Sequence, residues 1–493
     1  MHFCTRSLIL LLFSPVKLSN SFSQELSCYY VRRELRDLTK RDLELFLDTF
    51  VTLFRTPTAE GVKLYGKHYR SLTDLCAMHL RAAGTRDTDH IHDGLGLVTQ
   101  HVAMTMEFEL SLQTVAPRIA VPYWDYTIDA TELQTKYPGE YFTSISKFFY
   151  ESKLFTDEVF GKTDSTTSHV ENGRMAEMKV AQDYNFEVRS SRGYLRAPWN
   201  INPSAKVTRY HSICGVDEIT SDSKALIWPT CAVHLSTITE FGSWDDWSWN
   251  AGYVPHGPIH SWIGGVGGGD CDEKFTALVT NGYMEKSKLV DFKSKAFSRL
   301  KNAWRGEVIE VPKYCSEDAP LSECTWTCAE DIENNANAAL YLEPSGIYAS
   351  EMSAANYSKI ARTAYCTTTY WPGDMFEAAS PAEASFWPIH PTMERLLVAK
   401  DIMQPFESKE WGSSGVCHYI STSDCKGHHA GDLTYWKSTV KDNSTGVFKT
   451  VHLTNQELRH AVMPSTGAHS VPYIYAHFTW PHCDDIGVDF PKL

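Results

Sequence analysis

The chain has 493 residues, 13 of them cysteine, and a formal net charge of −14 from 46 Lys and Arg against 60 Asp and Glu. This excess of acidic residues disfavours a nucleic-acid-binding function, which needs clustered basic residues to neutralise phosphates. The hydrophobic content of 43% and the charged content of 22% are those of a globular protein with a substantial core. No apolar run approaches the ~20 residues that a membrane-spanning helix needs, so we predict no membrane span.

The N-terminal segment has the pattern of a secretory signal peptide. Residues 1–23 combine a weakly basic start, an apolar stretch at 8–13 and small residues near the end. A buried N-terminal strand or helix is the alternative. Removing this segment takes away Cys4 and leaves an even number of cysteines, which suits complete disulfide pairing in an oxidising compartment. With glycosylation acceptors at Asn356 and Asn443, the pattern predicts a secreted glycoprotein.

Three segments early in the chain have apolar residues at helical spacing. Residues 40–55 follow Thr39, which is suited to cap the helix N-terminus. Residues 70–81 repeat the same spacing, and residues 101–115 end before Pro117, which stops a helix. We predict a helix in each segment.

The later parts of the chain are less regular. Residues 135–250 are aromatic and loop-rich, and a glycine run at 264–269 marks a break. Residues 270–375 have the features of a cysteine-containing insertion with mixed helix and loop. Residues 405–493 alternate short β-like runs, such as 447–453, with Gly, Pro and Asn turns, which predicts a β-rich C-terminal region.

Two histidine pairs have spacings that can bring imidazoles together. His256 and His260 are four residues apart, so on a helix they lie on one face about a turn apart. His92 and His101 would lie on opposite faces of a continuous helix, but the glycines between them permit a break that lets the rings converge. His390 precedes a third helical pattern, in which the following proline suits the first helical position. From spacing alone, such histidines are more often surface or core-edge residues than metal ligands.

Three short blocks of sequence follow one another along the chain, and each has a characteristic spacing of its residues. The first runs from His101 through FE to the PYWD of residues 122–125, the second is HGPIHSWIGG at 256–265, and the third is FWPIH at 386–390, followed by Glu394 and Arg395. They resemble the copper-site segments of the tyrosinase, catechol oxidase and molluscan haemocyanin family of type-3 binuclear copper proteins. The stretch YYVRRELRDLT is similar to the family's N-terminal opening, so the resemblance covers roughly residues 30–400.

This resemblance implies a mainly α-helical fold, in which a four-helix-bundle core carries a binuclear copper centre. Such a centre needs three neutral imidazoles for each of two copper ions, because imidazole suits both copper oxidation states. The competing first ligand is His68, but His79 lies at the inner end of its helical pattern, as in the family. The implied ligands are His79, His92 and His101 for one copper, and His256, His260 and His390 for the other.

Other histidines in the sequence are given non-ligand roles. His90 is two residues from His92, so a supporting or surface position is expected. His428 and His429 imitate a dipeptide often found at the family's last ligand, but Ala-Gly-Asp follows them rather than an apolar helix. We therefore predict that they form a loop pair.

The resemblance also implies a domain organisation. A separation of 130 residues lies between His260 and His390, where the family usually needs far fewer. The insertion within it is large enough to cover the copper pocket or to form a separate subdomain. The predicted organisation is a signal peptide at 1–23, a tyrosinase-like copper domain at 24–400 with the insertion at about 270–375, and the C-terminal region at 401–493.

The implied activity is that of a polyphenol oxidase, which uses two copper ions and dioxygen to oxidise small phenols to o-quinones. Many monophenol-hydroxylating members of the family have Asn where this chain has Gly257, so o-diphenols are the predicted substrates and monophenol hydroxylation stays open. Asp245 or Asp246 is a candidate for a nearby acid. The alternatives are a haemocyanin-like dioxygen carrier, a non-catalytic copper protein, and a zinc site, which needs fewer histidines.

Overall fold

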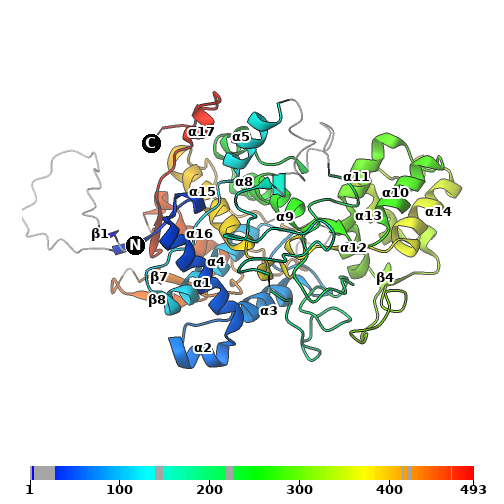
Figure 1. Ribbon diagram of the computed structural model, residues 1–493. Helices are drawn as coiled ribbons and strands as arrows, with labels where there is room; N and C mark the ends of the chain where they lie inside the picture. Colours follow the sequence, from blue (N-terminus) through cyan, green and yellow to red (C-terminus); the bar gives the residue numbers. More distant parts are fainter. Residues whose placement is uncertain are drawn as a thin grey trace, which may run out of the picture.

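The computed structural model describes residues 3–4, 28–138, 148–149, 151–176, 178–217, 226–413, 416–418, 424–442, 444–467 and 469–492. This part of the chain is mainly helical, as predicted, and its strands form only small sheets (Figure 1). Apart from Phe3 and Cys4, the predicted signal peptide lies outside the described residues. None of the described helices has both the length and the apolar character needed to cross a bilayer.

The three early helices form close to where their periodicity placed them. Thr39 caps the first of them by accepting a hydrogen bond from the backbone of Asp42. The predicted helix at 101–115 begins earlier, at Leu97. The helices of this part are α1 (Lys40–Arg55), α2 (Thr58–Tyr65), α3 (Leu72–Ala83), α4 (Leu97–Val115) and α5 (Tyr126–Lys136).

The middle of the chain supplies a second group of helices. They are α7 (Cys231–Thr239), α8 (Trp244–Ala251), the π-helical turn η4 (Gly252–His256) and α9 (Gly257–Gly264), with α15 (Phe386–Met403) following much later. The insertion has the predicted mixture of helix and loop, and its helices gather at one end of the molecule (Figure 1). They are α10 (Cys271–Thr280), α11 (Leu289–Ser294), α12 (Ala296–Arg305), α13 (Ala336–Leu342) and α14 (Ala354–Arg362).

The strands of the described residues pair in four small sheets. β2 (Cys28–Arg32) lies between β1 (Phe3–Cys4), which is antiparallel to it, and β9 (Tyr473–Tyr475), which is parallel. The antiparallel pairs are β3 (Val266–Gly267) with β6 (Trp371–Pro372), β4 (Ile309–Glu310) with β5 (Thr327–Cys328), and β7 (Ser438–Lys441) with β8 (Phe448–Val451). The C-terminal region also contains α16 (Asn455–Val462) and α17 (Pro481–Asp484), between turns and short strands.

A buried ion-pair cluster joins the two ends of the chain to the helical core. Arg32 on β2 is fully buried, and its guanidinium lies 2.8 Å from Glu109 on α4 and 2.7 Å from Glu394 on α15. The hydroxyl of Tyr473 on β9 donates a hydrogen bond to Glu394 as well. Because a buried charge is costly unless it is paired, this cluster fixes how α4 and α15 sit against the terminal strands.

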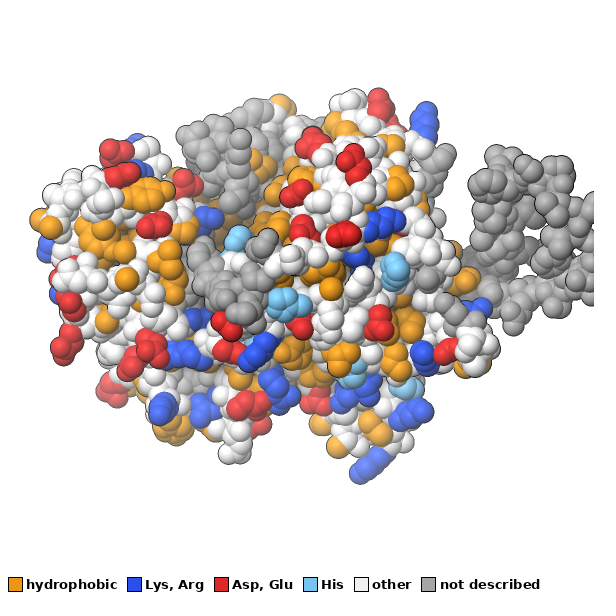
Figure 2. Space-filling model, turned by 180° about the vertical axis from the view of Figure 1, so that it is seen from behind, with side chains coloured by type: hydrophobic (Ala, Val, Ile, Leu, Met, Phe, Trp, Pro, Cys, Tyr) orange, Lys and Arg blue, Asp and Glu red, His pale blue; other side chains and the backbone are white. Residues whose placement is uncertain are grey.

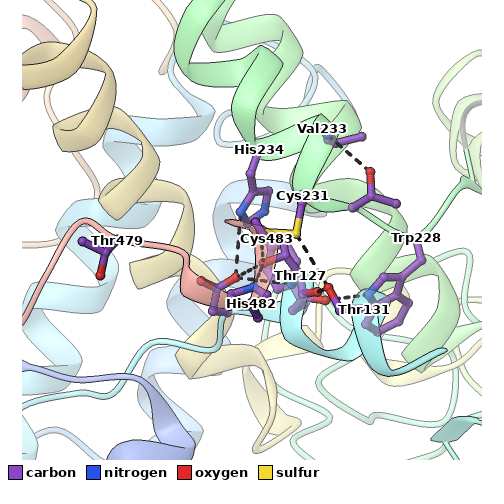
Figure 3. Close-up of a disulfide and its surroundings, with 12 residues drawn as sticks. Thr127, Thr131, Trp228, Cys231, Val233, His234, Thr479, His482 and Cys483 are labelled. Carbon is purple, nitrogen blue, oxygen red and sulfur yellow. Dashed lines mark hydrogen bonds and ion pairs between the residues drawn. A yellow bond between two sulfur atoms is a disulfide. The ribbon is translucent and has the colours of Figure 1, made fainter. Parts of the chain in front are cut away.

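Five disulfides are formed among the described residues: Cys214–Cys271, Cys231–Cys483, Cys315–Cys324, Cys328–Cys366 and Cys417–Cys425. Figure 3 shows how Cys231–Cys483 ties α17 to α7 across a sequence separation of 252 residues. The prediction that every cysteine after residue 23 is paired is wrong, because Cys76 is free and buried. Its thiol faces the core from α3 and donates to the carbonyl of Ala379, so it packs as a small apolar residue.

The surface carries charged side chains of both signs. On the face seen in Figure 2, acidic and basic side chains are interspersed rather than gathered by sign. Such a surface offers no extended basic stripe for a nucleic-acid backbone on that face.

Candidate metal centre

His256 and His260 lie on one helical face, as their spacing predicted. His256 ends the π-helical turn η4, which contains Pro255, and His260 follows one turn later in α9. Proline has no N–H to donate within a helix, and π-turns of this kind are frequent at functional sites. The Nε2 atoms of the two rings are 2.9 Å apart. A single metal ion could therefore be held between them.

His390, in the first turns of α15, joins these two histidines, and the three form what we call the second cluster. Its Nε2 lies 3.1 Å from Nε2 of His256. The helix begins at Phe386, so the prediction that it starts at Pro391 is wrong, and Pro391 lies inside it. The first turn tolerates proline because its N–H groups have no partner within the helix, and Pro388 occupies that turn.

The first cluster draws one histidine from each of α3, a loop and α4. The ring centroids are 5.0 Å apart for His79 and His92, 4.9 Å for His92 and His101, and 5.6 Å for His79 and His101. The predicted break between the last two exists, since α4 begins only at Leu97. A Cβ at Gly96 would lie 2.2 Å from the carbonyl oxygen of Gly427, so glycine here also allows the C-terminal region to approach.

The two clusters adjoin one another. The rings of His101 and His390 stack with centroids 4.6 Å apart and an interplanar angle of 11°. Phe386 lies against both clusters, with its ring centroid 4.2 Å from that of His390 and 5.8 Å from that of His79. Within each cluster, the candidate ligand atoms all lie within 4.8 Å of one another. The six predicted histidines thus form two neighbouring sets of three.

Five of the six rings are oriented by backbone carbonyls on Nδ1. The distances are 2.7 Å for His79 to Ala378, 2.8 Å for His101 to Leu97, 3.2 Å for His256 to Gly252, 2.9 Å for His260 to Met375 and 3.0 Å for His390 to Phe386. A carbonyl only accepts, so Nδ1 carries the proton and Nε2 presents a lone pair. His92 places Nδ1 3.1 Å from a carboxylate oxygen of Asp89, with the same result.

The Nε2 nitrogens that face the inside of the clusters have the properties of metal ligands. Nε2 of His79 and of His101 is buried and has no hydrogen-bond partner in the described part of the chain. Buried polar atoms are rarely left without a partner, so these two atoms indicate a missing ligand. The donor set, six imidazoles in two triplets, suits copper in either oxidation state.

Burial keeps five of the six rings neutral. It lowers the pKa of His79 to about 3 and that of His260 to about 4. Burial, followed by neighbouring imidazoles, also lowers the pKa of His101, His256 and His390 well below the ordinary value. Only the neutral ring ligates a metal, so these histidines are held in the competent form.

A cavity of about 360 Å³ opens onto one side of the centre. It reaches His92, His256 and His260, and Gly257 lies in its wall. The insertion contributes Lys295, Phe297 and Lys301, together with serines of α11 and α12, whereas its described lining includes nothing from 401–493. The insertion therefore walls the cavity and leaves room inside it.

The remaining sequence candidates lie elsewhere. His68 is half-buried between α2 and α3 and belongs to neither cluster. His90 bonds to the hydroxyl of Tyr435 and lies 3.3 Å from Asp87. Asp245 accepts a hydrogen bond from the backbone of Gly412, and neither it nor its neighbour Asp246 lines the cavity.

Supporting groups of the first cluster were missed at the sequence level. His428 is a loop histidine, as predicted, but it is fully buried and places Nδ1 3.1 Å from the backbone nitrogen of Gly96. Its Nε2 lies 2.8 Å from the carbonyl of Asp89. The spacing of Asp89, three residues before His92, is a signal that could have been used, whereas backbone carbonyls leave no trace in the sequence.

A third group of potential ligand atoms, Cys231, His482 and Cys483, is not a metal site. Both cysteines are consumed by the disulfide, and His482 pairs with the hydroxyl of Thr127 at 2.7 Å (Figure 3). A metal needs thiolates, which a disulfide does not provide.

One family model matches part of the chain and agrees with the resemblance. The family model for the common central domain of tyrosinase matches residues 69–285, a range that holds every proposed ligand except His390. No curated protein matches the chain. Among solved structures, a variant of a polyphenol oxidase from Thermothelomyces thermophila matches with 12% identity and a TM-score of 0.44, over 91% of this chain and 89% of that one.

Proposed function

We propose that the protein is a polyphenol oxidase that converts o-diphenols to o-quinones with dioxygen, and the match of residues 69–285 to the family model for the common central domain of tyrosinase supports this proposal. The observation that carries the proposal is the convergence of six imidazoles, each of which has its Nδ1 atom within hydrogen-bond distance of an oxygen of the protein. One copper would be held by His79, His92 and His101, and the other by His256, His260 and His390.

Copper supplies the redox couple that links phenol oxidation to dioxygen reduction when it is bound. Each o-diphenol loses two electrons and two protons, and dioxygen accepts four of each in becoming water. Two diphenols are therefore oxidised for each dioxygen. The histidines of the chain hold the metals and keep a fixed tautomer, and no side chain is needed as a nucleophile.

The shape of the cavity favours an aromatic substrate at the second cluster. Its volume of about 360 Å³ suits a small phenol, and the rings of Phe297 and Phe376, with centroids 4.4 Å apart, give it an apolar wall. Gly257 leaves the space next to His256 free of a side chain that could help to deprotonate a monophenol. These features support o-diphenol oxidation over monophenol hydroxylation. They also favour an enzyme over a dioxygen carrier, whose pocket would exclude phenols.

The decisive experiment combines metal analysis with an oxidation assay. We expect two coppers per chain, and quinone formation with oxygen uptake on methylcatechol. His260→Ala should reduce the copper content to about one per chain and abolish quinone formation, because each metal would need its three imidazoles. His90→Ala is the matched control, since His90 lies two residues from a proposed ligand but outside both clusters, and it should retain both coppers.

Two results would contradict the proposal. Unchanged copper content in His260→Ala would reject the ligand assignment. A protein that holds two coppers and binds dioxygen, yet leaves methylcatechol unoxidised, would be a carrier rather than an oxidase.

We also propose that the protein is secreted. Five disulfides among the described residues are typical of an oxidising compartment. Expression in a secreting host should give a mature N-terminus near residue 24 and a glycan on Asn356, both detectable by mass spectrometry. Retention of the segment 1–23 in the exported protein would contradict cleavage.

A further inference from the structure

Lys295 stands in the cavity wall at the junction of α11 and α12. Its backbone N–H donates to the carbonyl of Asp291 at 3.2 Å, and its own carbonyl accepts from the backbone of Arg299 at 2.9 Å. The hydroxyl of Ser298 donates to that carbonyl as well, at 3.1 Å. Both helices therefore fix the backbone of Lys295, and the residue lines the cavity.

The other charged groups of the cavity wall already have partners. The ammonium of Lys301 pairs with Asp93 and lies 3.9 Å from Asp89, which is also 3.7 Å from Arg305. The carboxylate of Glu377 accepts hydrogen bonds from the backbone of Ala379 at 2.7 Å and of Ala197 at 3.0 Å. These charged groups are therefore already paired with other groups of the protein.

Lys295 differs from them, because its ammonium has no hydrogen bond or ion pair with any described residue. Burial lowers its pKa, since taking an unpaired cation out of water disfavours the charged form. Two charges also act on its pKa: the carboxylate of Asp291, on the exposed side of α11, raises it, and the guanidinium of Arg299 lowers it further. An anionic group in the cavity would offset this cost.

The cavity therefore brings three features together in one space. His256 and His260 border it on the metal side, Phe297 and Phe376 form an aromatic wall, and Lys295 adds an uncompensated cation. An aromatic ring with an anionic side chain has the matching chemistry. We propose that Lys295 selects o-diphenols that carry a carboxylate on a short side chain, with the ring hydroxyls at His256 and His260 and the carboxylate at the ammonium. This inference rests on the proposed oxidase function and names its substrate class.

The test compares three catechols that differ in charge: dihydrocaffeate, methylcatechol and dopamine. The native protein should have its highest kcat/KM with dihydrocaffeate. Lys295→Met should lower kcat/KM for dihydrocaffeate about tenfold relative to methylcatechol, as expected for the loss of one charge-assisted hydrogen bond. Lys295→Glu should reverse the order, so that dopamine becomes the better substrate.

Lys286→Met is the matched control, because Lys286 is an exposed lysine of the same insertion that does not line the cavity. It should leave the order of the three substrates unchanged. Methylcatechol turnover, which the proposal leaves unaffected, reports whether each variant has folded. An unchanged ratio of dihydrocaffeate to methylcatechol in Lys295→Met would overturn the inference.

A binding measurement separates this inference from the oxidase proposal. Phenylpropionate carries the carboxylate but no hydroxyl to oxidise, and its Kd, measured by calorimetry on the copper-loaded protein, should rise about tenfold in Lys295→Met. If the native protein oxidises none of the catechols, the oxidase function fails while the binding data still judge Lys295. Equal Kd values in the native protein and in Lys295→Met would reject its role in anion recognition.

Discussion

The two histidine clusters differ in what holds their rings. In the cluster of His256, His260 and His390, every Nδ1 bonds to a backbone carbonyl, and every histidine comes from a helix or its π-turn. In the other cluster, His92 comes from a loop and bonds to the carboxylate of Asp89 instead. Its side chain is also 26% exposed, whereas His79 and His101 are buried.

The carboxylate that orients His92 depends on distant parts of the chain. Lys301 and Arg305 approach it from α12 of the insertion, and His428 contacts its backbone from the C-terminal region. A backbone carbonyl survives any substitution, but a side-chain network does not. The second cluster is therefore secured by backbone carbonyls, and the first is secured in part by long-range side-chain contacts.

The clusters also share one support. The carbonyls of Met375 and Ala378 orient His260 and His79, so one short segment serves both. Glu377 lies between them. Burial, followed by the charge of Asp374, raises its pKa from 4.5 to about 7. An acid with a raised pKa stabilises the fold fully below its unfolded pKa, and that contribution is lost as the pH rises through about 7.

The largest expected effect follows from this shared segment. Over the same range the buried histidines act in the opposite direction, because their lowered pKa values make the fold more stable as the pH rises. The contribution of Glu377 is therefore measured as a difference from Glu377→Gln, since glutamine does not ionise. The free energy of unfolding of the native protein, relative to that of Glu377→Gln, should fall by about 3 kcal/mol between about pH 4.5 and about pH 8.5, as urea denaturation of both proteins at each pH would show. A difference that stays constant with pH would show that Glu377 does not titrate in this range.

A second prediction tests the asymmetry directly. Asp89→Asn should weaken copper binding at the first cluster about 10- to 100-fold and leave the second cluster unaffected, because groups behind a ligand tune its affinity by that amount. Titration with a copper chelator would resolve the two sites. Asp87→Asn is the control, since Asp87 lies in the same loop but is 48% exposed and does not contact His92. Equal weakening of both sites would break the comparison.

A third prediction concerns the cavity beside the second cluster. A Cβ at Gly257 would meet only the carbonyl oxygen of Gly252, at 3.3 Å, so a side chain fits there with a small adjustment. Gly257→Asn should raise monophenol hydroxylation, measured with p-cresol, by at least about tenfold, through placement of a polar group near the phenol. Gly257→Ala supplies the Cβ without the amide. No gain of Asn over Ala would show that this position does not limit the reaction.

The smallest effect is expected at Cys76, one turn before His79 on α3. Its thiol is buried and makes one weak hydrogen bond to Ala379. Cys76→Ala should cost about 1 kcal/mol of unfolding free energy through the small cavity it leaves. Copper content and oxidation rate should not change. A loss of copper would mean that the first cluster is coupled to this side of α3.

Much of the candidate site could be read from local patterns. Helical spacing places His256 and His260 on one face, and glycines between His92 and His101 allow the break that both rings need. Periodicity also separates His79, which faces the core, from His68, which does not. These features depend on residues within one or two turns of each other, where backbone geometry fixes the outcome.

Other parts could not be read in that way. The start of α15 could not be predicted from the sequence, because Pro388 and Pro391 both suit the first turn of a helix. The choice between them depends on packing against α4, where Phe108 of α4 stacks on Trp387 of α15. Disulfide partners such as Cys231 and Cys483 are likewise set by how the helices pack. Cysteine number alone admits many pairings, and it failed to single out Cys76 as free.

The sequence by itself predicted the early helices from short-range periodicity, and its resemblance to a known family, carried by motifs with a fixed spacing, implied the six histidines and their proposed chemistry. Only the tertiary structure decided which distant groups support them: the carbonyls of 375–378, the partners in α12 of the Asp89 carboxylate, and the cation of Lys295 in the cavity wall. The physical reason is that contacts between residues hundreds of positions apart depend on how buried surfaces pack and how buried charges find partners. Neither is encoded in any local run of residues.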